Sequence, residues 1–128
     1  MFNEGKDELM ANGLPSTCSF DLSVRQIGLG GTPLAATTTF AGGYGVATGT
    51  GYAAQTQAEP TPSAGVASFS QKSWATGSAT DWPALVYTVI LRTATKLICA
   101  WHLQAGGTGR AMNAANTTEN FTPTLTLS

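Results

Sequence analysis

Two runs of alternating apolar and polar residues near the middle of the chain predict a β-hairpin. In residues 85–91 the apolar side chains of one face are Leu85, Tyr87, Val89 and Leu91. In residues 96–103 the corresponding face carries Leu97, Cys99, Trp101 and Leu103. This alternation is typical of strands, in which successive side chains point to opposite faces. Residues 92–95 form a connection short enough for antiparallel neighbours, so we expect the hairpin to be the central packing element.

Shorter segments predict further strands separated by turns. Residues 20–25 alternate clearly, and short runs at 37–40, 52–56 and 66–71 favour further pairing. Residues 42–51 are too rich in glycine to hold a regular ladder and are expected to form a long loop. Residues 121–127 predict a half-buried last strand with threonines on one face. Pro123 favours an edge position for that strand, because proline has no N–H to donate.

One segment, from Glu4 to Asn12, predicts a short peripheral helix. Asn3 is the expected N-cap, and Gly13 followed by Pro15 is expected to end the helix. Short strands with turns and no helices between them predict an all-β fold. We therefore expect a single antiparallel β-sandwich or jelly-roll-like domain, in which residues 1–15 form the helix and an arm and residues 16–128 form the sandwich. A chain of 128 residues is long enough for one such core.

Charged residues make up 10% of the chain, against about 25% in an average globular protein. The formal net charge is -1 and no cluster of Lys or Arg occurs. Direct binding of nucleic acid is therefore not expected, because neutralised phosphates supply most of that affinity. No apolar run approaches the roughly 20 residues that cross a bilayer, and the first residues are acidic where a signal peptide is basic. We expect no membrane insertion and a protein that is made and kept in a cytosol.

The two cysteines, Cys18 and Cys99, are expected to be free thiols. Nothing in the sequence indicates an oxidising compartment, in which a disulfide between them would persist. Cys99 also shares its predicted face with Leu97 and Trp101, as a small buried apolar side chain does.

Residues that could carry out chemistry are few and scattered. His102 is the only histidine and lacks partners at zinc-site spacing, so a surface or interface position is expected. A Ser-His-Asp arrangement stays open, although no Gly-x-Ser-x-Gly motif is present. The carboxylates available to flank a glycosidic bond are Asp21, Glu59, Asp81 and Glu119, of which Asp81 is expected to cap a turn. The sequence thus predicts no catalytic residue, no metal, no cofactor and no enzyme.

The tryptophans leave two hypotheses open. Trp74 and Trp82 bracket a loop of small residues, and Trp101 lies on the apolar face of the predicted hairpin. A role in the core or as a loop anchor comes first, because each indole buries a large area. The alternative is that Trp74 and Trp82 contact a partner protein or stack on a glycan, which requires exposed rings.

Several segments, taken in chain order, resemble one family of proteins. They are the N-terminal helix with the strand at 20–27, and then residues 49–53, 75–82, 97–101 and 120–127. With these segments the chain resembles small structural proteins of tailed bacteriophages, of the tail-fibre-like or virion decoration kind. The resemblance implies a compact β domain that forms oligomers on a particle and has no catalytic residues.

A weakly charged surface rich in threonine and alanine loses little hydration energy when it packs against other copies. The first hypothesis is therefore a capsid decoration or cement protein, located in the virion after assembly in the host bacterial cytoplasm. Its partners would be itself, as a homotrimer, and the major capsid protein. The alternative is a tail or head fibre component that contacts tail proteins or a host surface glycan. A third hypothesis is a carbohydrate-binding module or a small glycan hydrolase.

Overall fold

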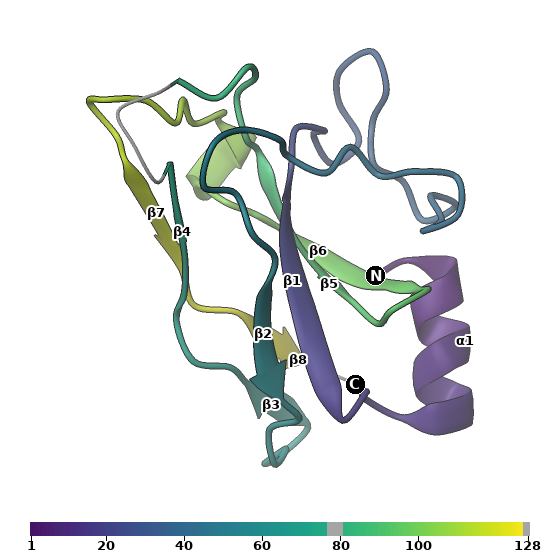
Figure 1. Cartoon of the computed structure of the whole chain (residues 1–128). Coiled ribbons are helices and arrows are strands. Elements are labelled where there is room, and N and C mark those ends of the chain that lie inside the picture. Colours follow the sequence, from purple (N-terminus) through teal and green to yellow (C-terminus); the bar gives the residue numbers. More distant parts are fainter. Residues whose placement is uncertain (77–80, 127–128) are drawn as a thin grey trace.

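The computed structural model describes residues 1–76 and 81–126, and over these ranges it contains one α-helix and short antiparallel strands (Figure 1). The helix α1 spans Asn3–Asn12, and a 3-10 turn spans Ala105–Gly107. The strands are β1 Thr17–Ser23, β2 Gln55–Ala58, β3 Val66–Ser68, β4 Lys72–Ala75, β5 Thr88–Arg92, β6 Leu97–His102, β7 Thr118–Phe121 and β8 Thr124–Thr126. The predicted class, all-β with a short N-terminal helix, is confirmed.

The largest sheet has four strands in the order β2-β1-β5-β6. The predicted hairpin is confirmed, because β5 pairs with β6 in antiparallel register. Its turn is closed by a hydrogen bond of 2.9 Å from the Thr93 N–H to the Lys96 carbonyl. The predicted strand at 37–40 is absent, and residues 42–51 form the expected loop, which we call the glycine-rich loop.

A β-bulge changes the predicted faces of the hairpin. The register moves by one residue between Leu91, which pairs with Cys99, and Arg92, which pairs with Leu97. Ile98 is therefore an extra residue on β6, and it joins Cys99 in the same buried cluster. Leu97 packs in a different cluster, so the prediction that it shares a face with Cys99 is wrong.

The start of the hairpin also departs from the predicted alternation. Leu85 is 44% exposed and Tyr87 is half-buried, whereas Val86 is completely buried. Regular pairing begins only at Thr88, and Val86 instead exchanges backbone hydrogen bonds with Arg110. The predicted alternation of buried and exposed positions therefore does not hold before the start of β5.

Strands β3, β4, β7 and β8 form one bent ribbon. β3 pairs with β8 and β4 pairs with β7, and the Phe69 N–H donates to the Pro123 carbonyl between the two pairs at 3.1 Å. The register differs by one residue on the two sides of this point. The run predicted at 121–127 is interrupted here, between β7 and β8, because Pro123 cannot continue the ladder, and its residue 127 lies outside the described residues. The run predicted at 66–71 is a strand only over 66–68.

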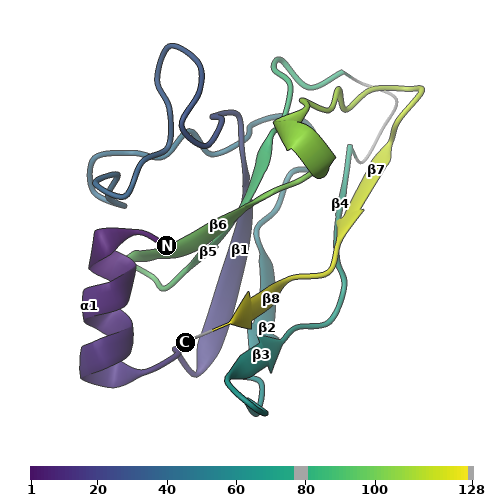
Figure 2. The same cartoon turned by 180° about the vertical axis from the view of Figure 1, so that it is seen from behind.

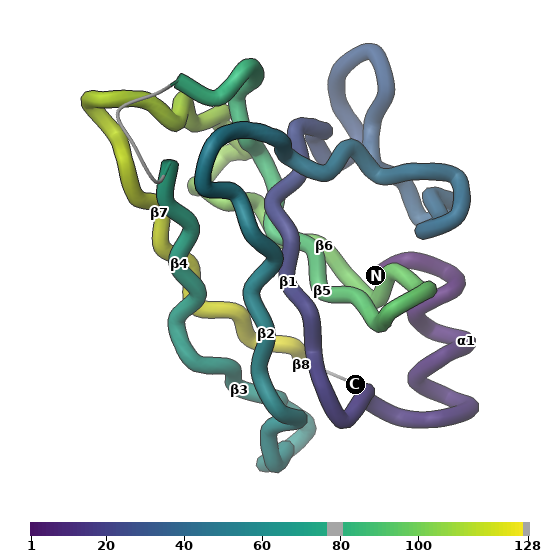
Figure 3. The backbone as a smooth tube through the Cα atoms, viewed as in Figure 1, coloured from purple at the N-terminus to yellow at the C-terminus, as the bar shows by residue number. Residues whose placement is uncertain are grey.

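The four-stranded sheet is covered on both faces. Between the sheet and the ribbon lies the larger buried cluster, which includes Phe20, Leu22, Phe69, Trp74, Val89, Ile98 and Leu125. Against the other face lies a smaller cluster of Phe2, Leu34, Tyr44, Ile90 and Leu97. Seen from either side, α1 and the ribbon flank the sheet (Figure 2). The long connection from β1 to β2 passes over one end of the sheet (Figure 3).

Helix α1 closes the outer edge of β6. The Phe2 N–H donates to the Ile98 carbonyl at 3.0 Å, and one carboxylate oxygen of Glu4 accepts from the Leu97 N–H at 2.7 Å. Gly5 is buried here, and a Cβ at this position would lie 2.4 Å from the Ile98 carbonyl oxygen. Only glycine allows this approach of helix to strand.

The helix ends as expected but begins differently. Gly13 follows Asn12 with φ 72°, and its N–H donates to the Leu9 carbonyl at 2.9 Å. The N-cap is Phe2, with no side-chain capping bond, and Asn3 is the first helical residue. The prediction that Asn3 caps the helix is therefore wrong. Its N–H is satisfied instead by the Ala36 carbonyl at 2.8 Å.

Candidate functional site

A cluster of polar side chains inside the protein surrounds Asp21 of β1. Its carboxylate is 2% exposed and accepts hydrogen bonds from the hydroxyls of Tyr44 and Tyr52, each at 2.6 Å. The Arg92 guanidinium also donates to this carboxylate and forms an ion pair with it. The Tyr52 hydroxyl in turn accepts a hydrogen bond of 3.1 Å from the Leu22 N–H. Leu22 lies past the last residue of β1 that pairs with β2, so the tyrosine takes the place of a strand partner there.

The hydrogen bonds of this cluster hold segments of the fold together. Burial and the hydrogen bonds to Asp21 raise the pKa of both tyrosines above their ordinary range, so their hydroxyls stay protonated and donate. Tyr44 lies in the glycine-rich loop and Tyr52 directly follows it. One carboxylate therefore ties both ends of this loop to β1, with every partner satisfied.

The other candidate carboxylates do not join Asp21. Glu119 of β7 is buried and accepts from the Arg110 guanidinium at 2.8 Å, while Glu59 and Asp81 are exposed. No hydrogen bond or ion pair among the described residues connects two of the four. The predicted turn cap at Asp81 stays a prediction, because residues 77–80 just before it lie outside the described residues.

His102 and the two cysteines are separate as well. His102 is exposed on β6, beside Gly107. Both cysteines are free, as expected, and both are buried, which was expected only of Cys99. Burial raises the pKa of Cys18 to about 11 and that of Cys99 to about 12. Such thiols are protonated at neutral pH and are poor nucleophiles. Within residues 1–76 and 81–126, no group of three or more His, Cys, Asp or Glu side chains converges on a possible metal position.

Trp74 and Trp82 are core residues in this fold. Their exposed fractions are 1% and 6%, so the condition for glycan stacking or a partner contact by either ring is not met. Trp82 donates from Nε1 to the Thr50 carbonyl at 2.8 Å, and its ring meets Tyr52 edge-on at 5.6 Å. Gly49 contacts the indole so closely that a Cβ there would lie 2.3 Å from it. Trp82 therefore anchors the glycine-rich loop.

Trp101 connects the sheet to the ribbon. It is half-buried on β6, and its Nε1 donates to the Thr124 carbonyl of β8 at 2.9 Å. Its ring stacks near Phe20 at 6.5 Å and lies near Phe121 at 6.1 Å. These contacts hold the two layers together, as the predicted core role requires.

Lys72 is a buried cation that the sequence did not reveal. Its ammonium donates to the Gln57 side-chain oxygen and to the carbonyl and hydroxyl of Ser70, the last two at 2.8 Å. It also lies 5.2 Å from the centre of the Phe20 ring. All these partners are neutral, and burial lowers the pKa of the amine. The residue joins β4 to β2 but has no carboxylate partner among the described residues.

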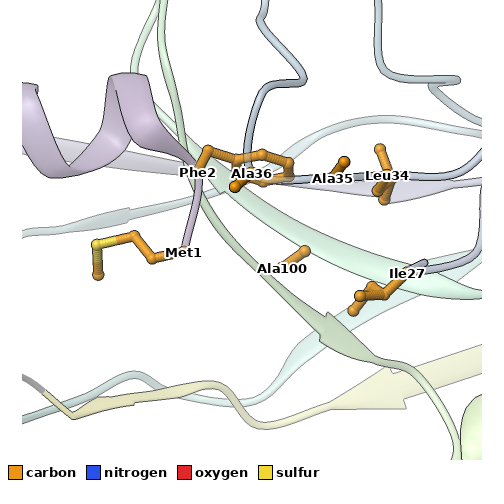
Figure 4. Close-up of a pocket in the computed structure, with 7 residues that line it drawn as sticks. All are labelled: Met1, Phe2, Ile27, Leu34, Ala35, Ala36 and Ala100. Atoms are coloured by element: carbon orange, nitrogen blue, oxygen red, sulfur yellow. The ribbon is translucent and has the colours of Figure 1, made fainter.

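An apolar cavity of about 100 Å³ opens beside the start of α1 (Figure 4). Its lining consists of Met1, Phe2, Ile27, Leu34, Ala35, Ala36 and Ala100. Phe2 and residues 34–36 form one wall, and Ala100 and Ile27 lie across from them (Figure 4). A space of this size and character suits one apolar side chain, and it has no polar side chain to orient a reacting group.

No family model, characterised protein or solved structure matches this chain. Within the described residues, no helix has the length and apolar character needed to cross a membrane.

Proposed function

We propose that the protein is a structural component of a tailed-bacteriophage virion, which decorates the outside of the capsid as a homotrimer. In this role each copy binds the major capsid protein and its neighbours, and the added contact area resists the internal pressure of the packaged DNA. The fold serves as a small β-sandwich, with the four-stranded sheet as one layer and the bent ribbon as the other. The protein acts by stoichiometric binding and is not an enzyme.

The observation that carries this proposal is the apolar cavity in Figure 4. Interfaces that hold copies together have apolar centres, in which a side chain of one subunit fills a pocket of the next. The chain also carries protruding apolar side chains that fit such a pocket, among them Leu29, which is 62% exposed, and Leu85. A pocket and a projection at different places on one surface produce a ring when the rotation between copies closes.

The internal polar groups support the same role. Asp21, Glu4 and Glu119 are each engaged by donors from other segments, so these carboxylates stabilise the fold. The exposed connections are mainly uncharged, since charged residues are only 10% of the chain. Burying such a surface against neighbouring copies has a small electrostatic cost.

Filling the cavity tests the proposal. In Ala100→Leu the larger side chain occupies the pocket, and we expect a folded monomer where light scattering of the natural protein shows a trimer. Ala11→Leu, which adds the same atoms to an exposed position of α1, is the control and keeps the trimer. Mass spectrometry of purified virions then counts copies relative to the major capsid protein. A natural protein that is monomeric at all concentrations, or that is absent from virions and present only in infected-cell cytosol, would overturn the proposal.

A tail or head fibre component is the second candidate. Two surface cavities that share Arg25 favour it, because the guanidinium and the threonine hydroxyls offer donors to a ligand outside the particle. The copy number separates the candidates. A number comparable with that of the major capsid protein indicates the shell, and a far smaller number indicates the tail or a vertex.

A further inference from the structure

Arg25 is the one arginine of this chain without a carboxylate partner among the described residues. Arg92 is paired with Asp21 and Arg110 with Glu119. Arg25 donates from Nη1 to the Gly43 carbonyl at 3.1 Å, which leaves most of its N–H groups for another acceptor. A half-buried guanidinium with unused donors is a ready partner for an anion.

Two surface cavities meet at this side chain. One, of about 300 Å³, is lined by Arg25, Pro33, Ala35, Thr37, Thr38, Thr39, Gly42 and Gly43. The other, of about 420 Å³, is lined by Val24, Arg25, Gln26, Leu29, Gly30, Gly31, Thr32 and Tyr87. Neither lining contains an acidic side chain. Arg25 is the charged group of both.

Two hydroxyls of the first cavity accept hydrogen bonds from the backbone. Thr38 Oγ1 accepts from the Ala35 N–H and Thr39 Oγ1 accepts from the Gly42 N–H, each at 3.0 Å. A hydroxyl that accepts from the backbone keeps its own proton for another partner. Thr37 is exposed and adds a third hydroxyl to the same wall.

The position of Arg25 is fixed before any ligand arrives. Its N–H donates to the Ser23 hydroxyl and its carbonyl accepts from the Thr88 hydroxyl, both at 3.0 Å. Its aliphatic stem lies against Gly45, where a Cβ would come within 2.7 Å of Arg25 Cγ. A side chain that is already ordered loses little conformational entropy when it binds.

We propose that this surface binds an acidic saccharide, with the carboxylate of a hexuronic acid on Arg25 and its hydroxyls on the threonine wall. The combined space on the two sides of Arg25 exceeds what one acidic side chain of a protein would fill, and a sugar also uses the hydroxyls. The half-buried Tyr87 ring lines the second cavity and offers an apolar surface to the next sugar. The site is argued from Arg25 and the threonines and not from the trimer contact, so its failure would leave the proposed structural role intact.

Matched small ligands test the site. Methyl glucuronide and methyl glucoside differ only in the carboxylate, and the signal of the Arg25 side-chain N–H in a ¹H–¹⁵N NMR titration reports binding. We expect the glucuronide to bind about tenfold or more tightly than the glucoside. Arg25→Lys keeps the charge but loses the planar fork, and we expect it to lose about tenfold in affinity. Lys96→Gln, a charge change at the exposed hairpin turn, is the control and leaves the affinity unchanged.

Thr37→Val separates ligand binding from loop stability, because the Thr37 hydroxyl does not take part in the bonds that hold Thr38 and Thr39. We expect a loss of several-fold in glucuronide affinity with an unchanged melting temperature. N-acetylglutamate amide distinguishes a protein carboxylate from a sugar. Equal binding of glucuronide and glucoside, equal or tighter binding of the glutamate derivative, or no shift of the Arg25 signal would overturn the proposal.

Discussion

Asp21 of β1 and Tyr44 of the glycine-rich loop are joined by a buried hydrogen bond of 2.6 Å. The same carboxylate holds Tyr52 and Arg92, so a single residue organises two ends of a loop and the end of β5. A loop that bears so many glycines would lose much conformational entropy on ordering. The strength of these bonds therefore decides whether the loop is fixed.

Asp21→Asn is expected to lower the free energy of unfolding by about 3 kcal/mol. The reason is that the Arg92 guanidinium would be left without its counter-charge in a mostly buried position. Urea denaturation followed by circular dichroism measures the effect. Asp7→Asn removes an exposed carboxylate of α1 and should change the free energy by no more than about 0.5 kcal/mol. Equal values for the two variants would show that the network contributes nothing.

Stability is expected to fall at alkaline pH. Burial raises the pKa of Tyr44 and Tyr52, and it raises the pKa of Cys18 to about 11 and of Cys99 to about 12. A group whose pKa is raised by folding contributes stability that is complete below its unfolded pKa and is lost as the pH rises above it. The decline therefore begins near pH 9 for the thiols and near pH 10 for the tyrosines.

Denaturation midpoints measured in steps from neutral pH to pH 12 test this decline. Tyr44→Phe removes one of the titrating groups, so its stability should be lower at neutral pH but less sensitive to pH above 10. A natural protein whose stability stays constant across this range would contradict the assignment of buried, protonated hydroxyls.

Gly5→Ala is expected to destabilise the protein by about 1 to 3 kcal/mol, as overpacking does. Alanine is the better helix former by about 1 kcal/mol, but its Cβ would lie 2.4 Å from the Ile98 carbonyl oxygen, so the helix must move off β6. Gly31→Ala is the control, because no atom lies within 4 Å of its Cβ position. Thermal unfolding compares the two, and a Gly5→Ala protein as stable as the control would show that the helix is not held against the strand.

Lys72→Met is expected to leave stability within about 1 kcal/mol of the natural protein, whereas Lys72→Ala lowers it by about 2 kcal/mol or more. Methionine keeps the packing over Phe20 and avoids burying a charge whose neighbours are neutral. Folding lowers the pKa of the Lys72 amine below its unfolded value of 10.5. As the pH rises toward 10.5, the folded protein therefore loses this proton before the unfolded chain does, and the natural protein gains stability that the methionine variant does not gain. Urea titrations at pH 7 and pH 10 provide the comparison. A large loss in Lys72→Met would instead assign the hydrogen bonds to Gln57 and Ser70 a dominant role.

Local periodicity predicted the elements that depend on neighbours in the chain. The hairpin, the helix ended by Gly13, and the glycine-rich loop follow from alternation or from backbone freedom. The bulge at Ile98 could not be predicted from the sequence. Leu97, Ile98 and Cys99 are all apolar, so no alternation of apolar and polar residues shows which of them faces which side of the sheet. Which of them faces the ribbon is decided by the approach of α1 and by packing.

The polar contacts depend on residues far apart in the chain, and no local pattern marks them. Tyr44, Tyr52 and Arg92 reach Asp21 only when the connection from β1 to β2 folds over the sheet. Trp74 and Trp82, for which a partner or glycan contact was the alternative to a core role, are both buried. For Trp82 the reason is again a distant residue, since Gly49 lets the chain pass directly over its ring. Arg25 stood out only after the pairs of the other arginines were known.

The closure of β6 by the helix has a directional consequence. A sheet can pair with a strand of another molecule at any edge that has unpaired N–H and C=O groups. If both edges are open, such pairing can continue indefinitely and produce a fibre. Here one border is occupied by Phe2 and Glu4, and the opposite border of the four-stranded sheet is the short β2. At the Leu97–Ile98 end of β6 the helix therefore blocks the addition of a strand from another copy.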